Sequence, residues 1–394
     1  MREAVIVAGT RTGVGKAVRG NTATARSDDM MATVVQELMR QTEGRVSPED
    51  IEDLIIGCAM PEGSQGMNFA RVIALRAGLP VDVPGQTVNR FCSSGLQTIS
   101  MAAERIIANG ADVIIAGGAE SMSSIPMTGH HLSPNPYMAE HDPNVYMSMG
   151  LTAERVAKEF NINRKDMDEF AYQSHQKAAR AIDGGLFAQE IVPFEWEENV
   201  ISADGMPVLV KKKLINDEHL RRETTVEGLG ALKPVFKADG SVTAGNSSPL
   251  SDGAAGVIVM ERSMAEARGL QPLAKFIGFA VAGVRPEIMG VGPIMAIPKV
   301  LQRSGLTLKD IDLIELNEAF ASQSLAIIRT LELDTEKLNV NGGAIALGHP
   351  LGCTGSKLTV SLINEMKRRG GKYGMVTMCI GGGMGAAGIF ENLQ

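Results

Sequence analysis

One order of elements occurs twice along the chain, and this repeat constrains the fold more than any other feature. The segment 50–56, Asp-Ile-Glu-Asp-Leu-Ile-Ile, resembles the segment 310–316, Asp-Ile-Asp-Leu-Ile-Glu-Leu. Cys92 precedes Gly118 by 26 positions, and Cys353 precedes Cys379 by the same interval (118 − 92 and 379 − 353). Each interval holds a turn, an amphipathic helical pattern, a glycine-containing stop and an apolar run. We predict two similar half-domains, at about 1–121 and 272–394, with chance resemblance of two α/β units as the alternative.

Short apolar runs bounded by glycine alternate with helical patterns in the first half. The runs are 4–8, 54–57, 87–91 and 113–116, and the helical patterns are 28–40 and 95–108. Continuous apolar strands that alternate with helices are typical of a sheet covered on both faces. The sequence therefore predicts an α/β fold.

Residues 122–250 break this alternation. The stretch 123–144 is rich in Pro, His, Met and Ser and predicts a long loop, 152–181 is helical, and charged, irregular sequence follows. Residues 251–261 return to strand character. A long irregular insertion in a compact α/β core is often functional, so we predict a functional insertion at 122–250, with 251–271 completing the first half.

Composition excludes several classes of protein. A net charge of −7 argues against nucleic-acid binding. The four cysteines form no disulfide framework and no metal-ligand cluster, so we expect a reducing compartment and no metal. We see no signal or transit segment and no apolar run near the roughly 20 residues of a membrane span, so we expect a cytoplasmic protein without membrane insertion.

Three cysteines lie where a predicted strand is followed by a glycine- or serine-rich turn: Cys92, Cys353 and Cys379. A thiol at a helix N-terminus faces unpaired N–H groups and a partial positive charge, which favour the nucleophilic thiolate. Cys58, in an apolar run, is expected to serve packing alone. Because Cys92 and Cys353 are equivalent in the repeat, position alone does not choose between them as nucleophile.

Two further polar residues have the setting of a catalytic site. His349 lies in the segment 342–355, which holds five glycines in fourteen residues, and suits a general base for a cysteine elsewhere; a purely structural turn is the alternative. Asn317 follows the apolar run 313–316, where α/β folds place site residues, although it could instead cap a helix. The other five histidines stand in polar surroundings and are expected at the surface.

Together these segments resemble the signature blocks of the thiolase family. The blocks are Asn89-Arg-Phe-Cys-Ser-Ser-Gly, Asn317-Glu-Ala-Phe-Ala, the run from Asn341 through Gly-His349-Pro-Leu-Gly-Cys-Thr-Gly, and Cys379-Ile-Gly-Gly-Gly. The resemblance covers the whole chain in order. It implies the thiolase fold: two βαβαβαββ half-domains stacked as five α-β-α-β-α layers, with a loop domain inserted in the first.

The resemblance also implies roles for the site residues. Cys92 is the nucleophile that carries the acyl group, His349 the base and Cys379 the acid and base. Asn317 fixes a water for one oxyanion site, and the backbone N–H groups of Cys92 and Gly381 form the other. No catalytic role falls to Cys353.

Coenzyme A is implied as a co-substrate, with no permanently bound cofactor. Its implied contacts, including a loop at Thr243-Ala-Gly-Asn-Ser-Ser248, are Arg221 near the adenine and phosphates, Phe236 and Phe320 along the pantetheine, Ala244 and Ser248 beside its amides, and Met149.

Ser148 stands where many short-chain, biosynthetic thiolases carry His. This favours the degradative branch, which cleaves 3-ketoacyl-CoA in fatty-acid β-oxidation. The alternatives are an acetyl-CoA C-acetyltransferase with a shorter acyl pocket, and a non-catalytic acyl-CoA binding protein, which the retained cysteines and histidine oppose. The family resemblance further implies a homodimer or homotetramer, with 123–144 as a candidate tetramer contact and a multienzyme β-oxidation complex as a candidate partner.

Overall fold

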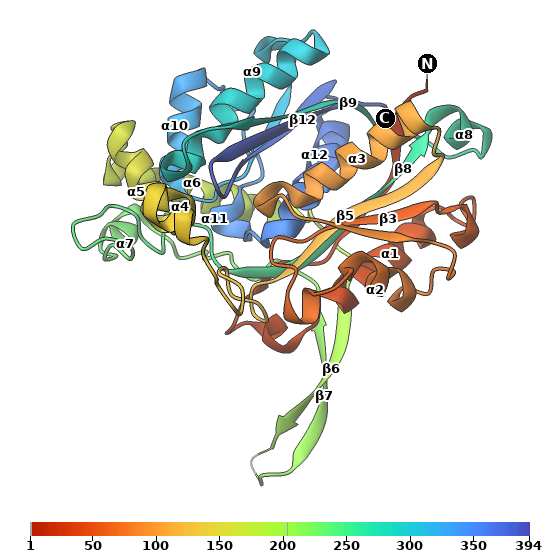
Figure 1. Ribbon diagram of the computed structural model, residues 1–394, viewed down its shortest axis with the longest axis horizontal. Coiled ribbons are helices and arrows are strands. Elements are labelled where there is room, and N and C mark those ends of the chain that lie inside the picture. Colours follow the sequence, from red (N-terminus) through yellow and green to blue (C-terminus); the bar gives the residue numbers. More distant parts are fainter. Residues whose placement is uncertain (1, 203) are drawn as a thin grey trace.

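The two halves of the chain have the same order of elements. The computed structural model describes residues 2–202 and 204–394 (Figure 1). The first half contains β1 (Ala4–Arg11), α1 (Ser27–Gln41), β3 (Asp53–Gly57), α2 (Phe69–Arg76), β4 (Gly85–Val88), α3 (Ser94–Asn109), β5 (Val113–Ser121) and β8 (Ser251–Glu261). The second contains β9 (Ala274–Gly283), α9 (Gly292–Ser304), β10 (Leu313–Leu316), α10 (Ala321–Leu331), α12 (Thr354–Arg369), β11 (Tyr373–Ile380) and β12 (Met384–Asn392). In the second half, a single parallel bridge between Ile314 and Leu338 takes the place of β4.

The strands of both halves join in one ten-stranded sheet. Its order is β10-β11-β12-β9-β1-β8-β5-β3-β4, and the short strand β2 (Gly15–Lys16) pairs with β8. The halves meet where β1 pairs with β9, at Val5 opposite Lys275. Each half therefore places its parallel strands outward and its antiparallel strands at the junction.

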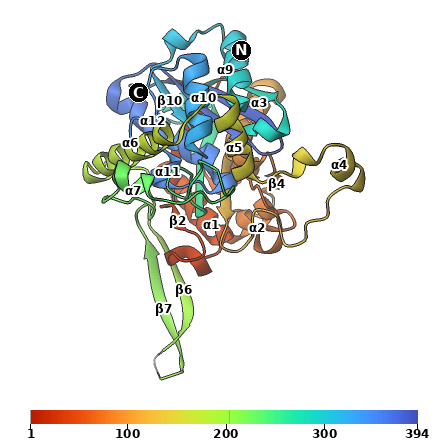
Figure 2. The ribbon, with the colours of Figure 1, turned by 90° about the vertical axis from the view of Figure 1, so that its left-hand side faces the viewer.

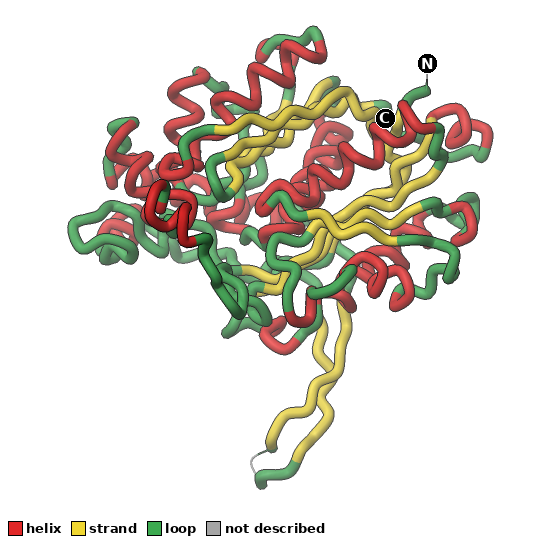
Figure 3. The backbone as a smooth tube through the Cα atoms, in the orientation of Figure 1, coloured by secondary structure: helices red, strands yellow, loops and turns green. Residues whose placement is uncertain are grey.

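Five layers result, as predicted, and Figures 1 and 3 show α3 and α12 between the two sheet halves. One buried core lies between α1, α2 and the first sheet half, a second surrounds α3 and α12, and a third lies under α9 and α10. Helices α3 and α12 approach closely because both carry glycine at the crossing. A Cβ on Gly355 would lie 2.2 Å from the backbone N of Leu96.

The insertion between β5 and β8 contains α4 (Pro136–His141), α5 (Met149–Glu159), α6 (Arg164–Asp183), β6 (Phe194–Ile201), β7 (Pro207–Leu214) and α7 (Val226–Gly230). The predicted loop at 123–144 therefore includes one short helix. The single helical pattern at 152–181 is two helices, because Asn161 has a φ of +53° and the Asn163 side chain caps α6. None of the described helices is long and apolar enough to cross a bilayer.

The expectation of irregular structure after α6 is wrong for the strands β6 and β7, which form a hairpin that projects from the body (Figures 1 and 2). Glu195 lies opposite Lys213 in the register and pairs with it at 2.8 Å. Trp196 stacks on Phe194, with ring centroids 5.0 Å apart. The cross-strand ion pair and the stack along β6 stabilise a ribbon whose charged residues hide its strand pattern in the sequence.

Candidate active site

Cys92 lies in a constrained turn at the start of α3. The turn is η4 (Phe91–Ser93), a 3-10 segment, and Phe91 has a φ of +44°, which is costly for an aromatic residue. Asn89 Oδ1 accepts the Phe91 N–H at 2.9 Å, and Ser94 Oγ donates to the Phe91 carbonyl at 2.6 Å. These two bonds hold the strained backbone, and η4 packs against β11 and against η8 (Leu351–Cys353) of the second half.

The environment of Cys92 disfavours a thiolate in the free protein. Burial raises the pKa of the Cys92 thiol to about 12, although the N–H groups of Gly381 and Cys92 itself, which donate to the sulfur, lower it. The expectation that the helix N-terminus would yield a thiolate is therefore not met, because desolvation outweighs the N–H donors. Cys92 needs a base to become a nucleophile.

The ring of His349 is held in one tautomer. Its Nδ1 lies 2.6 Å from Thr354 Oγ1, whose hydroxyl donates to the Pro350 carbonyl at 2.9 Å. Since that hydroxyl proton is engaged, Oγ1 accepts from Nδ1–H, and Nε2 carries a lone pair and no proton. The His349 backbone N–H donates to Ser251 Oγ at 3.0 Å, which fixes the main chain as well. An unprotonated Nε2 in a fixed ring is able to accept a proton.

Burial lowers the pKa of His349 to about 3, and the nearby charge of Lys357 adds to the effect. The ring is therefore neutral at physiological pH. With the raised pKa of Cys92, this makes thiol and imidazole both neutral in the free protein. Proton transfer between them thus creates two charges from two neutral groups.

Asn317 faces this base from the end of β10. Its Nδ2 lies 3.3 Å from His349 Nε2, and its backbone N–H donates to the Thr377 carbonyl at 3.0 Å. It does not cap a helix, because α10 starts four residues later with Phe320 at its N-cap. The buried Oδ1 has no hydrogen-bond partner among the described residues. A polar atom left open in this way suits a bound water.

Cys379 and Gly381 complete the cluster at the end of β11. Burial raises the pKa of the Cys379 thiol, and the neighbouring Cys92 raises it further. Gly382 and Gly383 have φ values of +80° and +90° and form the tight turn into β12. A Cβ on Gly381 would meet only ordinary contacts, 3.6 Å from Met149 Cε and Phe91 Cδ2. The structure therefore brings Cys92, Gly381 and Cys379 together.

Cys353 occupies the turn equivalent to that of Cys92, η8 (Leu351–Cys353), at the start of α12. Burial raises the pKa of its thiol to about 12. The repeat predicted this equivalence of position. The second half differs because its turn carries His349 four residues before the cysteine.

Glu120 connects the segment that follows β3 to the turn before α12, and it was missed in the sequence. One carboxylate oxygen accepts the Ala59 N–H at 2.7 Å and the Gly352 N–H at 2.9 Å, and the other accepts from Gln65 Nε2 at 2.7 Å. The Cys58 thiol lies 3.6 Å from the same carboxylate, so this cysteine has a polar contact and not packing alone. Glu120 lies at the C-terminal end of β5, as Asn317 lies at the end of β10, and this position could have identified it as a candidate site residue.

Two histidines expected at the surface are buried, His175 and His219. His219 Nε2 lies 3.0 Å from Ser251 Oγ and 3.1 Å from the Gly15 carbonyl, so it supports the serine that holds the His349 backbone. Burial lowers the pKa of both histidines to about 4. Their charged neighbours in the sequence gave no sign of this. The remaining three, His130, His131 and His141, are exposed as predicted.

Most of the predicted coenzyme A residues lie around Phe320. The rings of Phe236 and Phe320 meet edge to face with centroids 6.2 Å apart, and Met149 packs in the cluster that holds Phe320 and Cys379. The Ser248 N–H donates to the Ala319 carbonyl at 2.9 Å, beside Phe320. Ala244 and Arg221 are exposed.

Comparison with known proteins gives the family. Residues 4–263 match the N-terminal domain of thiolase and residues 270–392 its C-terminal domain. The 3-ketoacyl-CoA thiolase of Bacillus subtilis is 58% identical over 391 residues, which cover 99% of this chain and 100% of that protein. The crystal structure of the Bacillus anthracis acetyl-CoA acetyltransferase superposes with a TM-score of 0.90 at 41% identity, covering 100% of this chain and 99% of the other. The crystal structure of human mitochondrial 3-ketoacyl-CoA thiolase superposes with a TM-score of 0.87 at 40% identity, covering 99% of both chains.

This chain belongs to the thiolase family, and it is an acyltransferase.

Proposed function

We propose that the enzyme cleaves 3-ketoacyl-CoA with coenzyme A, giving acetyl-CoA and an acyl-CoA shortened by two carbons. The observation that carries the proposal is the unprotonated Nε2 of His349, held 3.3 Å from Asn317 Nδ2 at a site where the turns bearing Cys92 and Cys379 meet. Two thiols and one neutral base are the groups that a two-step acyl transfer needs.

In the first step His349 Nε2 takes the Cys92 proton, and the thiolate attacks the 3-keto carbon. The C2–C3 bond breaks, the acyl group stays on Cys92, and the acetyl-CoA enolate takes the Cys379 proton. The proton on His349 then passes to the Cys379 thiolate, which makes the imidazole neutral again. The two thiols are thereby used in turn.

In the second step coenzyme A gives its thiol proton to His349 and attacks the acyl carbonyl on Cys92. The tetrahedral intermediate collapses, Cys92 leaves as thiolate, and His349 returns the proton to it. Both half-reactions need the imidazole neutral at the start, which agrees with its lowered pKa, about 3. Protons and acyl groups balance over the cycle.

Two groups of donors serve the oxyanions. The open Oδ1 of Asn317 can fix a water that, with His349, binds the thioester enolate oxygen. The N–H groups of Cys92 and Gly381, which donate to the Cys92 sulfur in the free protein, can turn to the acyl carbonyl oxygen. Donors placed before the reaction stabilise the charge where it develops.

For coenzyme A we propose that Met149, Phe236 and Phe320 contact the pantetheine chain, Ala244 and Ser248 its amides, and Arg221 its adenine and phosphates. The edge-to-face pair of Phe236 and Phe320 supports this, because it forms an apolar wall beside Cys379. Coenzyme A then acts as a co-substrate, with no permanently bound cofactor.

The chain-length profile of thiolysis tests the substrate. We expect turnover of 3-ketodecanoyl-CoA, in keeping with the name of the 58% identical relative. Activity confined to acetoacetyl-CoA would instead support an acetyl-CoA C-acetyltransferase, the activity named for the Bacillus anthracis structure.

We also propose a cytoplasmic homodimer or homotetramer that serves fatty-acid β-oxidation, alone or with a multienzyme partner, and uses residues 122–250 as its loop domain. All four cysteines are free and buried, which supports a reducing compartment.

A further inference from the structure

The loop that carries Ala244 and Ser248 is held from behind by a buried polar network. Asn246, at its centre, is fully buried. Its Oδ1 accepts the Thr243 N–H at 2.8 Å, and its Nδ2 donates to the Ser241 carbonyl at 3.2 Å. The side chain of Asn246 therefore fixes the backbone on the N-terminal side of the loop.

The same amide reaches out of the loop to helix α6. Asn246 Nδ2 donates to Asp168 Oδ1 at 2.9 Å, and Asp168 is 2% exposed. The other carboxylate oxygen of Asp168 accepts from Arg164 Nε at 2.7 Å, one helical turn earlier. A buried carboxylate is thus satisfied on one side by a guanidinium and on the other by the loop.

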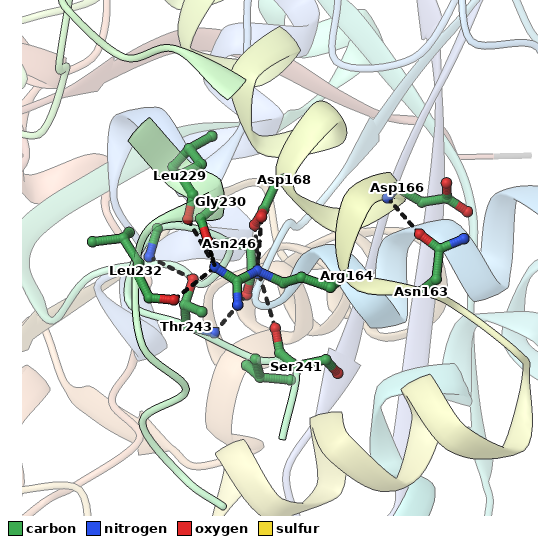
Figure 4. A network of polar contacts seen from close by, with 12 residues as sticks. Asn163, Arg164, Asp166, Asp168, Leu229, Gly230, Leu232, Ser241, Thr243 and Asn246 are labelled. Carbon is green, nitrogen blue, oxygen red and sulfur yellow. Dashed lines mark hydrogen bonds and ion pairs between the residues drawn. The ribbon is translucent and has the colours of Figure 1, made fainter. Parts of the chain in front are cut away.

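Arg164 ties a second segment to this carboxylate. Figure 4 shows its guanidinium between Asp168 and the carbonyls at the end of α7. Its Nη2 donates at 2.8 Å to the carbonyls of Leu229 and Leu232. A planar guanidinium donates in several fixed directions at once, which lysine does not do. The ion pair of Arg164 and Asp168 therefore holds two segments in place: the end of α7 with the residues that follow it, and the loop 241–248.

The network ends at the catalytic side of the loop. The Asn246 carbonyl accepts the Ala321 N–H at 2.9 Å, and the Ser248 N–H donates to the Ala319 carbonyl at 2.9 Å. Ala319 lies two residues after Asn317. The loop is clamped between α6 on one side and the Asn317 turn on the other.

We propose that Arg164 and Asp168 are positioning residues for the pantetheine chain of coenzyme A, acting through Asn246 on the loop of Ala244 and Ser248. Neither touches substrate or the reacting atoms. The proposal rests on the proposed function, because it takes that loop as the pantetheine contact. The proposal predicts separate effects on KM and kcat. Loss of the ion pair should weaken coenzyme A binding and leave the chemistry at Cys92 intact.

The test compares three variants of the full chain by steady-state thiolysis. Asp168→Asn removes the charge of the buried carboxylate at nearly constant shape, and Arg164→Lys keeps the charge but loses the planar fork. Asp166→Asn is the matched control. It lies on the same helix, away from the loop in Figure 4, and its carboxylate pairs with Arg329 of α10.

We expect Asp168→Asn to raise KM for coenzyme A about tenfold, equivalent to about 1.4 kcal/mol of binding, with kcat changed less than about threefold. Arg164→Lys should raise KM by a smaller factor, and Asp166→Asn should leave it unchanged. Iodoacetamide should alkylate Cys92 at the same rate in all four proteins, because that reaction does not use the loop.

Unchanged KM in Asp168→Asn and Arg164→Lys would overturn the proposal, as would an equal rise in the Asp166→Asn control. If Asp168→Asn does not fold, the Arg164→Lys result alone decides. Failure of the proposed function looks different: the wild-type protein would then give no thiolysis, whatever the variants do.

Discussion

The Nδ1 atom of His349 lies 2.6 Å from Thr354 Oγ1, and this contact places the ring proton on Nδ1 and leaves Nε2 unprotonated. Thr354 is the first residue of α12, so the helix that packs in the centre of the fold also orients the His349 ring. The tautomer thus depends on a contact within the second half of the chain.

Removing the Thr354 hydroxyl should leave the His349 ring without the hydrogen bond that fixes its tautomer and orientation. We expect Thr354→Val, which keeps the shape, to lower kcat on the order of 10-fold, less than the 10²–10⁴-fold that a general base contributes in full. Thr354→Ser keeps the hydroxyl and should retain most of the activity. Equal activity of the Val and Ser variants would contradict a role for the hydroxyl.

Asn317→Ala should remove the atom that holds the oxyanion water. Because that site acts in the step that forms the enolate, kcat for thiolysis should fall by about 10²–10³. The fold should survive, because Asn317 contacts other residues mainly through its backbone. A loss of less than about threefold in a folded variant would exclude this role.

The Cys379→Ala variant should distinguish the roles of the Cys92 and Cys379 thiols. We expect cleavage of the carbon–carbon bond to be lost, because the enolate has no acid, while transfer of acetyl from acetyl-CoA to Cys92 persists. Cys92→Ala should abolish both. Equal loss of both reactions in Cys379→Ala would contradict separate roles.

His219 should make stability depend on pH. Its pKa is lowered to about 4 in the fold from an ordinary value of 6.5, so the unfolded chain binds more protons between those values. The stability due to neutral His219 is present above pH 6.5 and is lost as pH falls towards 4. Its share of the slope is about 1.4 kcal/mol per pH unit.

Urea unfolding at several pH values checks this, with His219→Gln as the comparison because the Gln amide can still donate to the Gly15 carbonyl. The wild type should lose stability faster than the variant as pH falls from 6.5 to 4. Parallel curves would show that the ring does not titrate between the folded and unfolded states.

Gly381 and Gly383 should respond differently to alanine. A methyl on Gly381 has room, so Gly381→Ala should fold but raise KM for the acyl substrate, because the methyl enters the site between Met149 and Phe91. A methyl on Gly383 would lie 2.4 Å from the Val284 carbonyl oxygen at a φ of +90°, so Gly383→Ala should lose thermal stability. Thermal melts and KM measurements on both decide.

The internal repeat was the sequence feature that predicted the two-half organisation of the fold. Because the turns of Cys92 and Cys353, the strands after them and the helices between share spacing, the sequence predicted both halves, and the family resemblance implied their five layers. The same spacing could not show that the two halves differ chemically, since only the second carries His349.

What the sequence could not supply depends on contacts between distant segments. His219 is buried by Gly15 and Ser251, each more than 30 residues away, and its charged neighbours conceal this. The thiol of Cys92 sits at a helix N-terminus, as predicted, but the local rule omits desolvation, which raises the pKa. Glu120 joins three segments that only the fold brings together.

The central claim is that Cys92 carries the acyl group. Mass spectrometry of the intact protein and its peptides after mixing with acetyl-CoA tests it directly. We expect one acetyl group on the peptide containing Cys92, none on Cys353 or Cys379, and its removal when coenzyme A is added. An unmodified Cys92 in an active preparation, or an acetyl group on another cysteine, would contradict the mechanism.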